Sequence, residues 1–102
     1  MKCLTLFLHA SAEGDVLDCL RAHPRVSGFT LVACQGHSTS GSGGQEETTM
    51  DHVVGFVPRI RIEVILEDDQ VQEVLSGLKS CLGDQGSHGI WTISPVQDWG
   101  SL

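Results

Sequence analysis

The sequence predicts an α+β domain in which two helices pack on one face of a four-stranded antiparallel sheet. Residues 57–66 alternate apolar and polar side chains, which is the pattern of a half-buried strand. Residues 69–82 instead repeat apolar side chains at helical spacing. Over the whole chain the segments follow in the order β-α-β-β-α-β, which is typical of the ferredoxin-like arrangement.

The first half of the chain predicts a strand, a helix and a second strand. Residues 2–9 alternate leucine with other side chains and therefore predict a strand. Ser11 is a suitable N-cap for a helix that ends near His23, because Pro24 disfavours helical geometry in the residue before it. Residues 26–35 are rich in β-forming side chains and predict the second strand.

The second half predicts the same elements in the order strand, helix, strand. The alternating run 57–66 is the clearest strand of the chain. Asp69 and Gln72 approximate a capping box at the start of the helix over 69–82. Residues 90–96 predict the fourth strand. We expect the first and third strands to form the central pair, as the ferredoxin-like order requires.

The composition indicates one soluble domain spanning residues 1–102. The formal net charge is −7, with six Lys and Arg against thirteen Asp and Glu. Such a surface repels phosphate backbones, so a nucleic-acid partner is not expected. No apolar run approaches the length of a bilayer, so membrane insertion is not expected either. We expect a cytoplasmic protein.

The four cysteines, Cys3, Cys19, Cys34 and Cys81, are dispersed and form no Cys-x-x-Cys pair. In a cytoplasmic chain this spacing is typical of separate buried thiols, so no disulfide is expected.

Residues 36–56 form a long polar, glycine-rich insertion between the second and third predicted strands. A small domain rarely carries a connection of this length unless the connection has a function. Its many glycine, serine and acidic residues do not predict a packed structure. We therefore expect the frame to provide stability and this loop to provide function.

The face of the sheet opposite the helices predicts an oligomer. Two helices cover only one face of a four-stranded sheet, and the other face is too apolar for comfortable exposure. Contact with copies of the same chain would bury it, and we expect a cyclic homotrimer. The side chains expected on this open face are Phe7, Thr30, Val32, Arg59, Arg61 and Glu63.

Three segments carry a resemblance to a known family. They are VSGFT at residues 26–30, Gly36 at the start of the long loop, and GSHGIW at residues 86–91. Together with the element order, they resemble the PII-like, nitrogen regulatory protein-like superfamily of signal-transduction proteins. Within it, the chain is most similar to PII-like proteins of the DUF3240 type, which are associated with heavy-metal efflux systems.

The resemblance implies a homotrimer with ligand sites in the clefts between subunits. It places residues 36–56 at the position of the family's T-loop, which contacts partner proteins. A membrane transporter of the RND metal-efflux class is the partner implied. The positions implied to line the cleft are Gly36, His37, Gly86, His88 and Gly89.

Binding of ATP or ADP in the manner of the family is not expected. Gly89 stands where the nucleotide-binding relatives have a lysine, and no arginine follows the last predicted strand. The phosphates would therefore lack their usual cations. The sequence identifies no cofactor, although a divalent or monovalent transition-metal ion fits the donors present near the loop.

Cys34, His37 and His52 are the candidate metal ligands. Thiolate and imidazole suit zinc or copper, and loops of adjacent subunits could complete the ligand set. A single Cys-x-x-His is a weak signal, and the alternative of a buried thiol beside solvated loop histidines stays open.

Three functions remain open at this point. The first is a regulatory protein that senses a small ligand, a metal cation or a nucleotide, and acts through its loop on a transporter. The second resembles CutA, a metal-binding or metal-tolerance protein that holds the ion itself. The third is a structural trimer that only docks to a partner. An enzyme is not expected, because no nucleophile has a preorganised setting.

Overall fold

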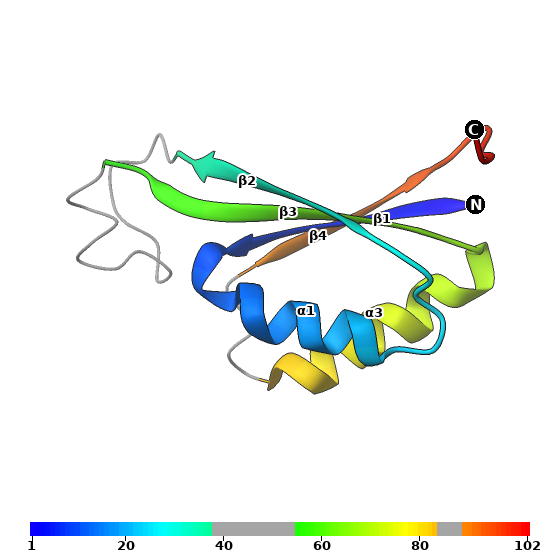
Figure 1. The fold of residues 1–102 in the computed structure, drawn as a ribbon, viewed down its shortest axis with the longest axis horizontal. Coiled ribbons are helices and arrows are strands. Elements are labelled where there is room, and N and C mark those ends of the chain that lie inside the picture. The colour runs from blue at the N-terminus through cyan, green and yellow to red at the C-terminus, as the bar shows by residue number, and fades with distance from the viewer. Residues whose placement is uncertain (38–54, 84–88) are drawn as a thin grey trace.

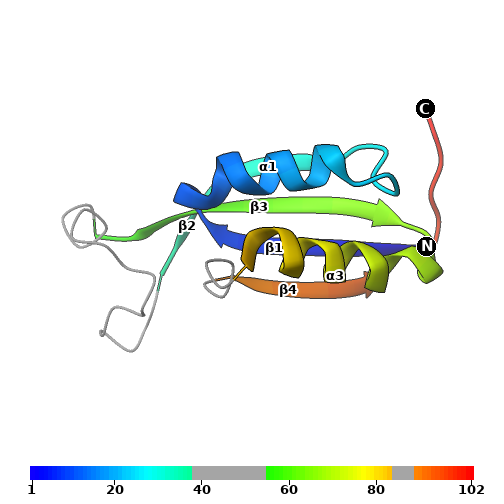
Figure 2. The same cartoon turned by 90° about the horizontal axis from the view of Figure 1, so that it is seen from below.

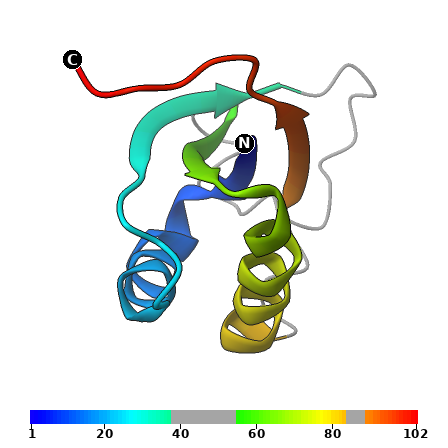
Figure 3. The same cartoon turned by 90° about the vertical axis from the view of Figure 1, so that its right-hand side faces the viewer.

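The computed structural model describes residues 1–37, 55–83 and 89–102. In these ranges a four-stranded sheet forms one layer, and two α-helices lie together on one face of it (Figures 1 and 3). The predicted order β-α-β-β-α-β and the ferredoxin-like α+β class are confirmed. The elements are β1 (Lys2–His9), α1 (Glu13–Ala22), β2 (Thr30–Gly36), β3 (Val57–Leu66), α3 (Val71–Leu82) and β4 (Ile90–Pro95).

The strands lie in the order β2-β3-β1-β4, and every neighbouring pair is antiparallel. The prediction that the first and third strands form the centre is confirmed. Leu4 lies opposite Val64 and Leu6 lies opposite Ile62 in the β1–β3 register. These four side chains therefore stand on one face of the two central strands, which is the face that the helices cover.

The core fills the space between the sheet and both helices. Helix α1 buries Val16 and Leu20, and α3 buries Val74 and Leu78, so each helix presents one apolar stripe to the sheet. Figure 2 shows the two helices lying side by side over the sheet. No helix within the described residues is long and apolar enough to span a bilayer.

The second strand begins later than predicted. Residues 26–35 were expected to be extended, but β2 runs from Thr30 to Gly36. Val26 and Phe29 instead pack against the core, because the chain here passes from the helix layer back to the sheet. Gly28 has open space around it and no strand partner. Hydrophobic side chains in this connection therefore resemble strand residues although they are not part of the sheet.

Both helices begin differently from the prediction. Ser11 lies in a 3-10 turn, Ala10–Ala12, and His9 is the capping residue, since its Nδ1 accepts a hydrogen bond of 3.0 Å from the Ser11 amide. The capping box before α3 is formed by Glu67 and Gln70. A 3-10 turn precedes each α-helix, so each cap lies nearer the preceding strand than sequence spacing suggested.

The expectation of separate thiols is wrong for two cysteines. Cys19 of α1 and Cys81 of α3 form a disulfide across 62 residues of sequence. Packing of the two helices brings their Cα atoms to 6.1 Å, which is within the range of a disulfide. Cys3 and Cys34 are free thiols, as expected. Spacing along the chain could not reveal a pair that only helix packing brings together.

Candidate functional site

Four strand ends meet at one end of the sheet, which we call the loop end. Here β2 ends at Gly36, β3 begins at Val57, β1 ends at His9 and β4 begins at Ile90 (Figure 1). Antiparallel pairing puts these ends together although they come from distant parts of the sequence. The insertion 36–56 and the segment that precedes β4 are therefore attached at the same end of the sheet.

Gly36 makes room for an arginine at the loop end. A Cβ atom on Gly36 would lie 2.5 Å from Nε and 2.8 Å from Cδ of Arg59. The arginine side chain therefore passes directly over the backbone of the neighbouring strand. Among the positions predicted to line a cleft, Gly36 thus has a packing role that its lack of a side chain explains.

His37 is exposed just beyond the end of β2. Its Nε2 atom lies 3.1 Å from Oε1 of Gln35, and its ring centroid lies 6.2 Å from that of Phe56. The Gln35 oxygen can accept a hydrogen bond from Nε2 only when Nε2 carries the proton, and in that tautomer Nδ1 keeps its lone pair. This nitrogen is a suitable donor for a metal ion.

Gly89 approaches the central strand β1 closely. A Cβ atom here would clash with the Leu8 side chain and would lie 2.8 Å from the Phe7 carbonyl oxygen. Gly89 therefore contacts the sheet directly before β4 begins. The other two predicted cleft residues of this segment, Gly86 and His88, lie outside the described residues.

The two groups of predicted cleft residues, one around Gly36 and one around Gly89, lie at the same end of the sheet. They lie at its opposite edges, however. Gly36 belongs to β2 and Gly89 precedes β4, and both central strands lie between them. Three strand spacings correspond to about 14 Å. A small ligand therefore cannot contact both glycines within one chain.

The candidate metal ligands are only partly described. Cys34 is half-buried on β2, opposite Arg59 of β3, and His37 follows three residues later. His52 lies outside the described residues. In the ranges 1–37, 55–83 and 89–102, no group of three or more His, Cys, Asp or Glu side chains could hold a metal ion. The metal site predicted from Cys34, His37 and His52 stays a prediction.

The face of the sheet away from the helices carries an apolar row across its width. In the registers of the four strands, Val32, Arg61, Phe7 and Ile90 lie side by side. Val32 is 40% exposed and Ile90 is 63% exposed. Nε of Arg61 lies 3.4 Å from Oε1 of Glu63, so the arginine on this row is already paired along its own strand. The open face therefore combines exposed apolar surface with an internally neutralised charge.

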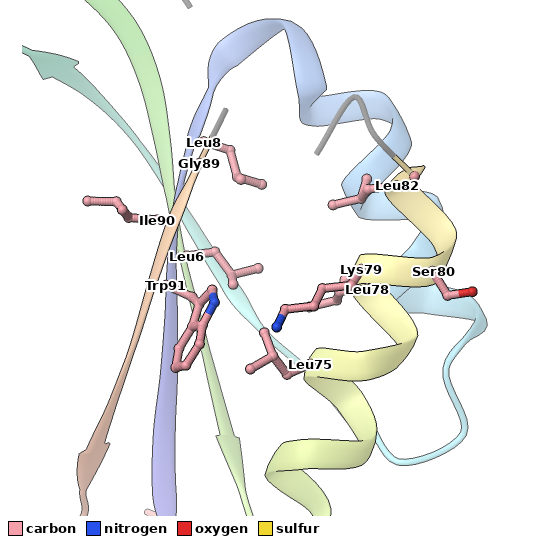
Figure 4. A pocket seen from close by; sticks show the side chains of 11 residues that line it. Leu6, Leu8, Leu75, Leu78, Lys79, Ser80, Leu82, Gly89, Ile90 and Trp91 are labelled. Carbon is pink, nitrogen blue, oxygen red and sulfur yellow. The ribbon is translucent and has the colours of Figure 1, made fainter. Parts of the chain in front are cut away.

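A groove that the sequence did not indicate lies on the other face, between α3 and β4. Its volume is about 550 Å³, and five of its eleven lining residues are leucines (Figure 4). The Lys79 ammonium lies 5.5 Å from the centroid of the Trp91 ring at this groove. Trp91 is 45% exposed. The spacing of Leu75 and Lys79, one helical turn apart, is the only sequence signal for the groove.

Comparison with known proteins identifies the family of the chain and a solved structure of similar fold. A family model described as "Protein of unknown function (DUF3240)" matches residues 1–102. The crystal structure of a DUF3240 family protein from Shewanella baltica is similar to this chain, with a TM-score of 0.75 and 20% sequence identity. The match covers 99% of this chain and 94% of that one. At this identity the likeness shows a shared fold.

Proposed function

The chain belongs to the DUF3240 family, whose function is unknown, and we propose from its geometry that it is a homotrimeric regulatory protein of the PII-like kind. It senses a small ligand at the clefts between subunits. Segment 36–56 then acts on a partner protein, such as a membrane transporter for metal efflux. The metal-efflux partner comes from the PII-like resemblance of the sequence.

The placement of Gly36 and Gly89 at one end but on opposite edges of the sheet is the observation that carries this proposal. A second copy placed beside the first would bring the β2 edge of one chain against the β4 edge of the next. His37 of one subunit would then lie near Gly89 of its neighbour. A cleft formed in this way needs no movement within either chain.

The open face of the sheet supports an oligomer independently. Both helices lie on one side of the sheet (Figure 3). The strand registers put Phe7, Val32 and Ile90 in one row on the other face, and contact with the sheets of two other copies would remove them from water. Burial of apolar surface contributes about 25 cal/mol per Å². A closed trimer buries the same face on every subunit and leaves each loop end at a junction.

A metal cation suits the donors at the loop end better than a nucleotide does. Cys34 and His37 provide sulfur and nitrogen donors, which zinc and copper prefer. Arg61 is paired with Glu63, and the net charge of −7 disfavours phosphates. We therefore propose a transition-metal ion as the sensed ligand, with His52 of the loop as a further donor.

We propose the cytoplasm as the site of action, and the Cys19–Cys81 disulfide is the observation that counts against it. Structural disulfides are rare in reducing compartments. Acid quenching of cells followed by alkylation would measure the redox state of the pair directly. Two free thiols at these positions would support the cytoplasm, and a complete disulfide would contradict it.

Titration calorimetry together with light scattering tests the proposed function. The chain should elute with the mass of three copies and bind zinc or copper, with ATP and ADP binding more weakly. His37→Ala should reduce metal affinity, whereas the control variant His23→Gln should not, because His23 caps the far end of α1. Absence of any metal binding would refute the sensing role.

A monomeric variant separates this proposal from a protein that stores the ion. If the ion binds between subunits, a variant that no longer forms trimers should lose metal binding. Equal binding by the monomeric variant would instead favour a CutA-like protein that holds the metal within one chain.

A further inference from the structure

The groove between α3 and β4 has the size and lining of a small-molecule site. Its volume of about 550 Å³ lies within the roughly 300–1,000 Å³ that is typical of ligand pockets. It opens beside β4, which is an edge strand of the sheet. Six side chains form most of its wall: Leu6, Leu8, Leu75, Leu78, Leu82 and Trp91.

Among the described residues that line the groove, Lys79 is the one with a charged side chain. Its ammonium lies 5.5 Å from the Trp91 ring centroid, and Figure 4 shows it on the groove side of α3. No carboxylate of the described ranges forms an ion pair with it. By contrast, Arg25 is paired with Glu73 at 3.0 Å and Arg61 with Glu63 at 3.4 Å.

Trp91 provides exposed apolar surface at the mouth of the groove. Its ring faces α3, whereas the preceding Ile90 points to the other side of the sheet (Figure 4). Because 45% of Trp91 is exposed, an apolar ligand that covers the ring would gain free energy from burial. The same ligand would shield Lys79 from water and strengthen any ion pair made there.

We propose that this groove binds an amphipathic anion, namely a medium-chain carboxylic acid. The hydrocarbon chain lies among the leucines and against Trp91, and the carboxylate pairs with Lys79. Apart from Lys79 and Ser80 the side chains of the wall are apolar, and one cation in such a wall matches a ligand with one negative head and an apolar body. A cationic amphiphile would be repelled by Lys79, and a polyphosphate would meet a single positive charge.

The groove and the proposed metal cleft share Gly89 but use different functional side chains. Lys79 and Trp91 belong to the groove beside β4, whereas the metal donors Cys34 and His37 lie on or next to β2, at the opposite edge of the sheet. The groove does not depend on those donors. It is also complete within one chain, so its occupancy does not require an oligomer. The two proposals can therefore fail independently of each other.

Three probes with the same apolar chain test the proposal: dodecanoate, dodecanol and dodecyltrimethylammonium, each below its micellar concentration. Calorimetry should show one dodecanoate per chain, weaker binding of dodecanol and weakest binding of the cation. In a Trp99→Phe background, dodecanoate should change the fluorescence of Trp91, which is then the only tryptophan. Absence of dodecanoate binding, or equal binding of the cationic probe, would overturn the proposal.

Lys79→Gln isolates the role of the charge. This variant should weaken dodecanoate binding by about tenfold or more and leave dodecanol binding unchanged, because a charge-assisted bond is lost. Lys2→Gln is the matched control, since Lys2 does not line the groove. Unchanged dodecanoate affinity in Lys79→Gln would refute the assigned ion pair.

Leu82→Trp isolates the role of the cavity. The larger side chain should fill part of the groove and weaken both dodecanoate and dodecanol, while circular dichroism confirms that the fold is kept. If this variant fails to fold, the Lys79→Gln comparison still decides the proposal. Binding of both probes to a folded Leu82→Trp protein at wild-type affinity would place them elsewhere.

Discussion

Gly36 and Gly89 are two positions at which a side chain would collide with the frame. Both were predicted to line a ligand cleft, and the structure gives each a packing role beside a neighbouring strand. Gly36 lies under the Arg59 side chain, and Gly89 lies against Leu8 and the Phe7 carbonyl. Backbone that must approach another strand this closely has no room for a Cβ atom.

Gly89→Ala should destabilise the protein by about 1–3 kcal/mol, because the backbone oxygen of Phe7 cannot move aside as a flexible side chain would. Denaturant unfolding measures the change. Gly14→Ala is the control, since its Cβ would have open space in helix α1 and should stabilise by up to about 1 kcal/mol. Equal stability of Gly89→Ala and the wild type would contradict the close approach of Gly89 to β1.

The carboxyl group of Asp68 has a lowered pKa. Its carboxylate lies 2.9 Å from the α-amino group of Met1, and this hydrogen bond, helped by the nearby positive charges, lowers the pKa of Asp68 below 3.8. Because the folded pKa is the lower one, the contact stabilises the protein above the unfolded pKa. The stabilisation is lost as the pH falls through the folded pKa.

Asp68→Asn should therefore be less stable than the wild type near neutral pH. The difference between the two proteins should be constant from about pH 5 to 7 and should shrink as the pH falls below about 4. Urea unfolding at a series of pH values measures it. A difference that persists unchanged at low pH would show that the ion pair is not its source.

At the scale of elements, the disulfide between α1 and α3 joins the two helices of one layer. Cys19 is nearly buried and Cys81 is exposed, so the bond lies at the surface of the helix layer. It closes a segment of 62 residues that includes β2, β3 and the insertion between them. The bond therefore restricts the unfolded chain over more than half of its length.

Reduction of this bond should lower the free energy of unfolding by roughly 2–4 kcal/mol. Cys81→Ser should show the same loss without a reductant, and adding a reductant to that variant should have no further effect. Cys34→Ser is the control, because Cys34 is a free thiol in the structure. An oxidised wild type no more stable than Cys81→Ser would show that the bond contributes nothing.

At the scale of the whole molecule, the sheet has one face covered by helices and one open face. Helices α1 and α3 cover one face, and the row formed by Val32, Phe7 and Ile90 remains on the other. The proposed trimer would bury this row on each subunit. The assembly, and not the single chain, would then form the sensing cleft.

Val32→Asp should dissociate the proposed trimer, because contact between subunits would bury an unpaired carboxylate. Sedimentation velocity should show a single-chain mass at concentrations where the wild type sediments as three. Trp99→Ser is the control, since Trp99 is a large exposed apolar residue that follows β4 and lies outside the sheet. A wild type that sediments as one chain would refute the trimer itself.

Local patterns predicted most of the frame. The alternation over 57–66 predicts β3 with its observed bounds, and apolar spacing predicts α3 to within two residues at its start. The second strand was placed too early. Val26 and Phe29 belong to the connection between α1 and β2, and they are apolar because they pack against the core and not because they lie on a face of the sheet. Apolar periodicity and strand propensity indicate that a segment is buried, but a segment can be buried in a connection as well as in a sheet.

The candidate site could be predicted only in part from the sequence. Sequence could place Gly36 and Gly89 beside strand ends, because those ends follow from the element order. The role of each glycine depends on which side chain or carbonyl lies opposite it, and that is fixed by strand register. The groove beside Trp91 depends on how α3 is positioned over β4, which local pattern does not encode.

Local sequence was enough to specify the elements, their order and the surplus of apolar side chains on the open face, because periodicity and turn residues act over short distances. Three-dimensional packing was needed to show that Cys19 meets Cys81, that Lys79 lies beside Trp91, and that the two halves of the predicted cleft stand on opposite edges. Each of these depends on distances between residues far apart in the chain, which form only when the helices pack on the sheet.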